Sequence, residues 1–166
     1  MRKLFSFPNP VNEKAARVVA GVVMLTGIVT LATDAYWLLA LLAYGFWARV
    51  LTGPTLSPLG RLASNVVAPR LGPSRPVAGP PKRFAQAIGA GLTTAAAIAA
   101  LAFGDDRLAA VLTGVLILAA GLESIFALCL GCRAFALLMR AGVIPESVCA
   151  ECADIWSRPG MAQPQS

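Results

Sequence analysis

Histidine is missing from this 166-residue sequence, and several kinds of site are missing with it. Without an imidazole the chain has no Ser-His-Asp or Cys-His catalysis, no HExxH zinc hydrolase motif and no histidine-ligated haem. Charge is also sparse: charged residues make up 13% of the chain, against about 25% in soluble domains. Aromatic residues contribute only 7%. This composition is not that of a soluble domain.

Apolar residues are abundant instead. They make up 57% of the chain, mostly as Ala, Val, Leu and Ile, and the mean hydropathy is +0.71. Such a mixture suits helices that face lipid, and the length fits one domain. The sequence therefore predicts an integral membrane protein with the lipid bilayer as its first partner.

Four apolar stretches are the candidates for spanning helices, which need about 20 residues each. A turn at Asp34 joins the first two and a turn at 104–107 joins the last two, so two helical hairpins are expected. The third stretch is rich in Ala and Gly and is expected to be the central packing helix. The four stretches cover residues 18–33, 35–52, 84–103 and 108–131.

The predicted fold class is thus all-α: a polytopic membrane protein with four transmembrane helices and a short cytoplasmic C-terminal helix. The predicted organisation has five parts. They are a cytoplasmic leader 1–17, a first hairpin 18–52, a basic proline-rich loop 53–83, a second hairpin 84–131 and a C-terminal segment 132–166.

Basic residues predict the orientation of the helices. With four spans, every Lys and Arg except Arg107 lies on one side, and Arg107 stands on the other side with Asp34, Asp105 and Asp106. Short loops rich in Lys and Arg stay cytoplasmic. Both termini are therefore expected in the cytoplasm and the protein in a bacterial inner membrane. No nucleic-acid partner is expected, because no aromatic–basic reader motif accompanies the positive charge.

The loop at 54–83 has seven prolines, five basic residues and no acidic residue. Prolines this dense prevent a long helix. Leu59, Leu62, Val66 and Val67 are expected to form one short apolar face on the membrane. The loop is interpreted as touching anionic lipid, or else as a docking surface for an acidic partner.

All four cysteines stand in two CxxC pairs, Cys129-Leu-Gly-Cys132 and Cys149-Ala-Glu-Cys152. Their spacing lies within the window for a four-cysteine structural zinc site, and four thiolates can also hold an iron–sulfur cluster. Alternatively, each pair is a dithiol that exchanges disulfides or sulfur with a cytoplasmic partner. Simple burial of the cysteines is the third interpretation.

Helix positions suggest roles for the two pairs. Cys129 and Cys132 are expected to close the fourth helix, where the helix dipole disfavours a thiolate. Cys149 is expected early in a short helix after Pro145, where the dipole lowers a thiol pKa. Cys149 and Cys152 are therefore predicted to be the nucleophilic pair, and the first pair the resolving or relay pair.

Glu123 lies about two turns inside the fourth predicted helix, where a carboxylate is costly unless it is paired or protonated. It is a candidate to carry protons to or from Cys129 and Cys132. The alternative is an interhelical ion pair, with Arg17 or Arg49 as the expected partner.

Four stretches spread over residues 7–135 carry a family resemblance. They are Phe7-Pro-Asn-Pro-Val-Asn-Glu13 with Arg17, Leu56-Ser-Pro-Leu59, Gly79-Pro-Pro-Lys-Arg-Phe-Ala-Gln86, and the fourth segment ending in Glu123 and Cys129-Leu-Gly-Cys132. In these the chain resembles the bacterial "domain of unknown function 4395" family, seen often in actinobacteria. The resemblance implies a four-helix membrane protein, sometimes fused or adjacent to thioredoxin-like or rhodanese-type sulfurtransferase proteins.

Together these observations favour a thiol–disulfide or sulfur relay at the cytoplasmic face, with a thioredoxin-like or rhodanese-type partner. In one version electrons pass to membrane quinone, because Cys129 is expected near the lipid. The alternative is a non-enzymatic scaffold clamped by zinc on Cys129, Cys132, Cys149 and Cys152.

Overall fold

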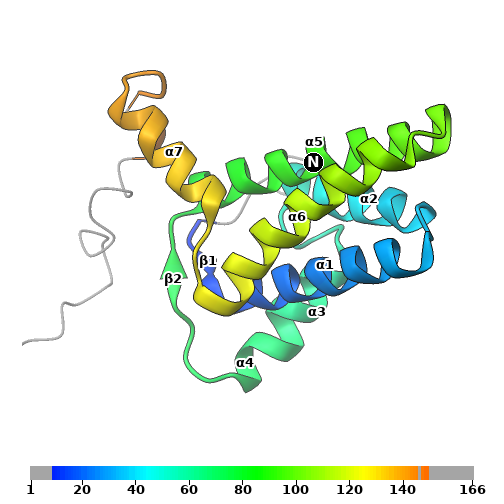
Figure 1. Cartoon of the computed structure of the whole chain (residues 1–166). Coiled ribbons are helices and arrows are strands. Elements are labelled where there is room, and N and C mark those ends of the chain that lie inside the picture. The colour runs from blue at the N-terminus through cyan, green and yellow to red at the C-terminus, as the bar shows by residue number, and fades with distance from the viewer. Residues whose placement is uncertain (1–8, 146, 150–166) are drawn as a thin grey trace, which may run out of the picture.

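The structure is a computed structural model that describes residues 9–145 and 147–149. The regular structure in these residues consists of helices and one short antiparallel ribbon, joined by turns and loops (Figure 1). In chain order the elements are β1 (Val11–Asn12), α1 (Glu13–Thr33), α2 (Trp37–Thr52), α3 (Pro58–Leu62), the π-helical turn η1 (Ala63–Val67), α4 (Ala68–Arg70), β2 (Pro76–Val77), α5 (Gly79–Phe103), α6 (Asp106–Phe126) and α7 (Leu130–Arg140).

Four helices form the bundle. α1 packs along α6, α2 packs along α5, and α5 also packs on α6 and α7. α5 is the helix rich in Ala and Gly, and the prediction that it is the central packing helix is therefore confirmed. α1 has its main contacts with α6 rather than with α2, although only a tight turn separates α1 from α2. The first predicted hairpin, α1 with α2, is therefore joined by a short turn but is not the pair of helices that packs most closely.

Glycines allow this close packing. A Cβ built on Gly27 of α1 would lie 2.7 Å from Cγ1 of Ile117 in α6. A Cβ on Gly89 of α5 would lie 2.3 Å from the ring of Phe46 in α2. Small residues permit such approach in lipid, where van der Waals contact rather than water exclusion holds helices together.

Among the described residues, three helices are long and apolar enough to cross a membrane: α1, α5 and α6. α2 is as apolar but has 16 residues, which gives it a length of about 24 Å. The hydrocarbon layer is about 30 Å thick. Leu25, Leu41 and Leu118 are among the large apolar side chains that stay exposed on the outside of the bundle, as expected of a lipid-facing surface.

One predicted helix boundary is wrong in a way that matters for the site. The fourth apolar helix does not continue to residue 131, because α6 ends at Phe126 and Ala127 adopts a left-handed conformation with φ 56°. The Leu128 N–H donates to the carbonyl of Leu122, and the Arg17 guanidinium donates to the carbonyl of Ser124 at 3.0 Å. Hydrogen bonds thus reach several carbonyls at the end of α6, and the chain then starts the new helix α7.

The segment between α2 and α5 contains more regular structure than its prolines suggest. Residues 58–70 form a continuous helical run through α3, η1 and α4. Leu59 packs against the bundle core, whereas Leu62 and Val66 are exposed. β2 then pairs with β1, with Val11 opposite Val77, and the backbone N–H of Gly79 donates to the Asn9 side chain. The chain before α1 is thereby tied to the start of α5.

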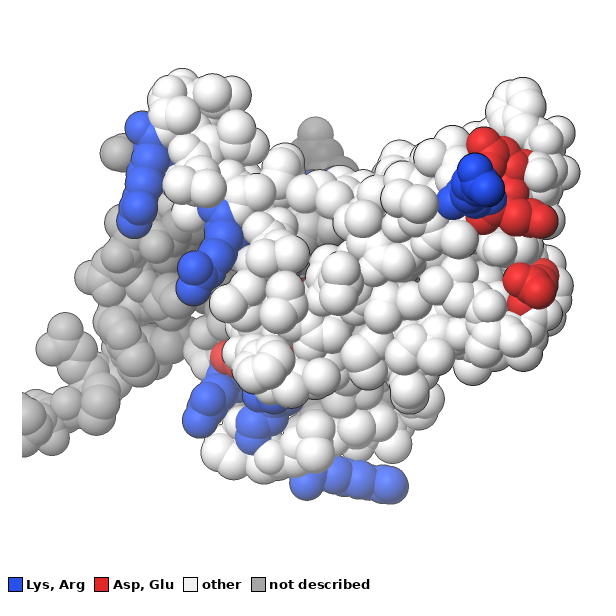
Figure 2. All heavy atoms as spheres, viewed as in Figure 1, with Lys and Arg blue, Asp and Glu red and all other residues white. Residues whose placement is uncertain are grey.

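Charge is separated along the molecule. Figure 2 shows Lys and Arg side chains at the end that carries α7 and the helical run, and acidic side chains at the opposite end. The opposite end holds the two tight turns of the bundle, with Asp34, Asp105, Asp106 and Arg107. This separation accords with the pattern that the sequence predicts.

Candidate functional site: a dithiol at the start of α7

The first CxxC pair lies at the N-terminus of α7 rather than at the end of a spanning helix. Cys129 is the N-cap residue, with extended backbone angles, and Cys132 lies in the first turn. Both are free thiols; Cys129 is buried and Cys132 is half-buried. The premise that a helix C-terminus disfavours thiolates at this pair is therefore wrong, because the positive end of the α7 dipole faces it.

Gly131 brings the dithiol close to α5. A Cβ on Gly131 would lie 2.5 Å from the Cβ and 2.6 Å from the Cα of Ala85. No side chain fits at this distance, since the obstacle includes backbone. The glycine inside the motif thus fixes the distance between the sulfur-bearing turn and the α5 helix.

An ion pair between Lys82 of α5 and Glu123 of α6 lies beside the two sulfurs. Both side chains are largely buried, with 10% and 16% of their surface exposed. Glu123 is therefore paired, as the sequence predicts, but with a different cation from those expected. Lys82 also interacts electrostatically with Cys129 and Cys132, so one cation lies close to the Glu123 carboxylate and to both thiols.

The two thiols differ in acidity. A hydrogen bond from the Cys132 thiol lowers the pKa of Cys129, and Lys82 lowers it further, whereas burial and Glu123 oppose the shift. The pKa of Cys132 is raised, because its proton is held in that hydrogen bond and because partial burial disfavours the charged form. Cys129 is accordingly the more acidic of the two thiols, and Cys132 is the donor in the hydrogen bond between them.

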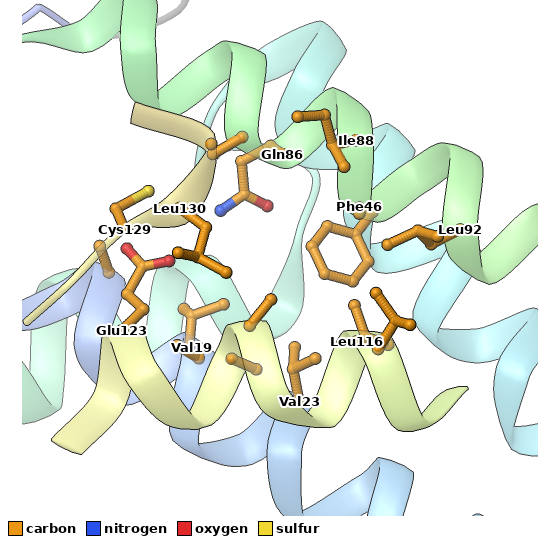
Figure 3. A pocket seen from close by; sticks show the side chains of 18 of the residues that line it. Val19, Val23, Phe46, Gln86, Ile88, Leu92, Leu116, Glu123, Cys129 and Leu130 are labelled. Atoms are coloured by element: carbon orange, nitrogen blue, oxygen red, sulfur yellow. The ribbon is translucent and has the colours of Figure 1, made fainter. Parts of the chain in front are cut away.

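Cys129 lines two cavities. Towards the basic end of the molecule lies a groove of about 490 Å³, lined by Cys129, Cys132, Lys82 and Arg133 together with Phe135 and apolar neighbours. Between the spanning helices lies a second cavity of about 260 Å³, which Cys129 lines but Cys132 does not. Figure 3 shows Glu123 and Cys129 at one end of this cavity and Phe46 and Leu92 at the other.

The second pair is only partly described. Cys149 is buried in a 3₁₀ turn formed by residues 147–149, where it packs with Ala78 and Phe135, and it is not a free thiol. Cys152 lies outside the described residues. Residues 147–149 of the predicted C-terminal helix form this turn, and the rest of that prediction lies outside the described residues.

No group of three or more Cys, Asp or Glu side chains in the described part of the chain is arranged to hold a metal ion. Cys149 packs in an apolar cluster and does not join Cys129 and Cys132 in such a group. A four-cysteine site also requires Cys152, which lies beyond the described residues. In the described part of the chain, the first pair supplies the free cysteine thiols.

The sequence missed Lys82 and misassigned two arginines. Arg17 donates to the carbonyls of Ser124 and Ile125, and Arg49 donates to Gln86 Oε1 at 2.8 Å. The sequence indicates Lys82 as a basic residue of the loop and as part of a family-like stretch, but not as the partner of Glu123. A signal was present, because Pro80 and Pro81 favour the first turn of a helix, which extends α5 back to Gly79 and places Lys82 within it.

Fold and site together define a helical membrane protein with a dithiol at a helix start, where the spanning bundle meets its basic end. A family model described as "domain of unknown function (DUF4395)" matches residues 11–140, and the chain belongs to that family. No curated protein and no solved structure matches the chain. The matched range includes α1 to α7 and, with them, Lys82, Glu123 and the first CxxC pair.

Proposed function

We propose that this protein is a thiol–disulfide relay of the bacterial inner membrane, with Cys129 and Cys132 as its reactive pair. In this proposal α1, α2, α5 and α6 all span the bilayer, and both termini are cytoplasmic. The charge separation along the bundle supports that orientation, since basic ends stay in the cytoplasm. The groove beside the dithiol is then open to a cytoplasmic thioredoxin-like protein.

The observation that carries the proposal is the position of Cys129 between the groove and the membrane cavity. Cys132 faces only the groove, while Cys129 lines both hollows. A disulfide between them offers a partner the Cys132 sulfur from the groove side. Cys129 is then the leaving group, and a thiol of low pKa leaves fastest in such exchanges.

The proposed thiol–disulfide exchange transfers two electrons in two steps. A partner thiolate attacks the Cys132 sulfur, the Cys129–Cys132 bond breaks, and Cys129 leaves as a thiolate beside Lys82. A second partner thiolate then attacks the partner's own sulfur in the mixed disulfide and releases Cys132, which takes up a proton. The partner is oxidised to a disulfide by two electrons, and the CxxC pair is reduced by the same two electrons.

A single-cysteine thioredoxin tests this assignment. Oxidised full-length protein is mixed with a reduced thioredoxin that lacks its resolving cysteine, and the mixed disulfide is mapped by mass spectrometry. We expect the thioredoxin on Cys132 and a free thiol at Cys129. Attachment at Cys149 or Cys152 contradicts the assignment, and stoichiometric zinc with four protected thiols contradicts the relay as a whole.

Topology is tested separately with a membrane-impermeant maleimide on intact cells. We expect Cys129 and Cys132 to stay unlabelled until the inner membrane is opened. A single-cysteine variant at Asp105 is the matched control, because the turn between α5 and α6 lies at the opposite end and should label from outside. Labelling of the dithiol in intact cells overturns the orientation.

A further inference from the structure

We infer that the cavity between the spanning helices binds the head group of a membrane quinone, which takes electrons from the Cys129–Cys132 dithiol. The inference rests on the proposed relay and names its second substrate class. It begins from the lining of the cavity. Almost all of that lining is apolar, and its polar side chains are those of Gln86, Glu123 and Cys129.

The three polar groups supply what a quinone ring needs. Gln86 accepts a hydrogen bond from Arg49 Nε through its Oε1, so its amide N–H₂ remains a donor for a ring carbonyl oxygen. In Figure 3 the Gln86 side chain points into the cavity on the side of Leu130. Glu123 lies at the sulfur end, where it can exchange protons with a reduced ring.

Size and access fit a ring with a long apolar tail. About 260 Å³ lies near the lower limit of small-molecule sites, roughly 300 Å³, and suits one substituted ring rather than a whole lipid. Ile88 of α5 and Val115 of α6 line the cavity, and their side chains are also 41% and 48% exposed. The cavity therefore reaches the lipid-facing surface between α5 and α6, where an isoprenoid tail can remain in the bilayer.

The electron balance closes with a quinone and with no further reagent. The Cys129 thiolate and the Cys132 thiol lose two electrons and form one disulfide bond. The quinone gains these two electrons and two protons and becomes a quinol. One proton comes from the Cys132 thiol, and the other enters through Glu123 from the basic end of the molecule.

Direct quinone reduction tests the inference. Purified full-length protein in lipid nanodiscs is reduced, freed of reductant and mixed without oxygen with decylubiquinone, whose fully substituted ring cannot be arylated by thiols. We expect about one quinol per chain, since both couples carry two electrons. We also expect a Cys129–Cys132 disulfide in the product.

Two variants that fill the cavity or narrow its opening, each with a matched control, locate the reaction. Ala119→Phe fills the cavity on α6, and Ala95→Phe places the same ring on an exposed position of α5 away from it. Ile88→Trp narrows the opening, and Ile98→Trp is its control on the same helix. We expect the cavity variants to reduce quinone about tenfold more slowly, a loss of about 1.4 kcal/mol, and the controls to match wild type.

Exchange with thioredoxin separates the two proposals. Ala119→Phe and Ile88→Trp should still exchange disulfides with thioredoxin at the wild-type rate, because the groove is untouched. Wild-type protein that exchanges with thioredoxin but leaves decylubiquinone oxidised overturns the quinone inference and leaves the relay standing. Equal quinone reduction by Ala119→Phe, Ile88→Trp and wild type also overturns the inference. Failure of both reactions overturns the relay itself.

Discussion

Lys82 and Glu123 form an ion pair across α5 and α6, directly beside the Cys129 sulfur. The pair links the two spanning helices at the level where the dithiol begins. It also has opposite effects on the thiol, since Lys82 lowers the pKa of Cys129 and Glu123 raises it. One ion pair thus contributes both to helix packing and to sulfur chemistry.

Substitution of Lys82 should weaken the thiolate. In Lys82→Met the pKa of Cys129 rises, because a positive charge beside the sulfur is lost, and alkylation of Cys129 at neutral pH becomes slower. Lys82→Arg keeps the charge and should alkylate at a rate near that of wild type. Peptide-resolved iodoacetamide alkylation across pH measures both, and an unchanged Cys129 profile in Lys82→Met contradicts this role.

The same substitution should destabilise the bundle. Lys82→Met leaves a buried carboxylate without its partner, which costs about 3 kcal/mol, as breaking a buried pair generally does. The double variant Lys82→Met, Glu123→Gln removes both charges and should recover most of that loss. Unfolding in detergent micelles measures the three proteins, and a double variant no more stable than the single one refutes a pairing role.

The proton on Cys132 should control Cys129. Cys132→Ser keeps a hydroxyl donor at this position, whereas Cys132→Ala removes the donor. We expect the pKa of Cys129 to be higher in the alanine variant, because the hydrogen bond from residue 132 is the largest influence that lowers it. The direction of this pKa shift is checked by the ultraviolet absorbance of the Cys129 thiolate, whose onset should move to higher pH in Cys132→Ala. Identical titration curves for Cys132→Ser and Cys132→Ala would contradict it.

Gly131 should tolerate no larger residue. Gly131→Ala places a methyl group within 2.6 Å of the Ala85 backbone, so α7 must move away from α5 at a cost of about 1–3 kcal/mol. Gly91→Ala on α5 is the control, because a methyl group there meets nothing within 4 Å. Thermal unfolding should separate the two variants, and Gly131→Ala should also expose Cys129 to maleimide. Equal melting temperatures would argue against the close contact.

Arg17 should hold the end of α6 in place. Its guanidinium donates to the carbonyls of Ser124 and Ile125, which have no further helical partner at the helix end. Arg17→Gln should increase hydrogen exchange of the backbone amides around residues 122–128, while Arg17→Lys keeps the charge and part of the effect. Unchanged exchange in Arg17→Gln would remove Arg17 from the account of the α6–α7 break.

The predictable part of this protein follows from hydropathy and charge. Apolar length located the four bundle helices, and the Asp34 and Asp105 turns marked their ends, because composition responds directly to lipid. The end of α6 was not predictable, since residues 126–131 contain no proline and their single glycine lies past the break. Arg17 contacts the end of α6 and Ala85 contacts the start of α7, and both residues are distant in sequence from that break.

Only the part of the site that depends on local sequence could be predicted. CxxC spacing and the depth of Glu123 marked reactive and buried groups from local sequence alone. Which cysteine is the more acidic depends on the hydrogen bond between Cys129 and Cys132 and on the nearby Lys82, and the sequence shows neither contact. Lys82 was missed because its partners, Glu123 and Cys129, come together only through tertiary packing of α5 on α6.

The β1–β2 pairing gives the protein a built-in order of assembly. Val11 is made long before Val77, so the leader cannot complete its ribbon until the first two bundle helices and the whole basic segment have been synthesised. α5 follows immediately after that ribbon and carries Lys82. Lys82 is therefore synthesised only after β2, and a chain that stalls after α2 would lack both the β1–β2 pairing and the Lys82–Glu123 pair beside the dithiol.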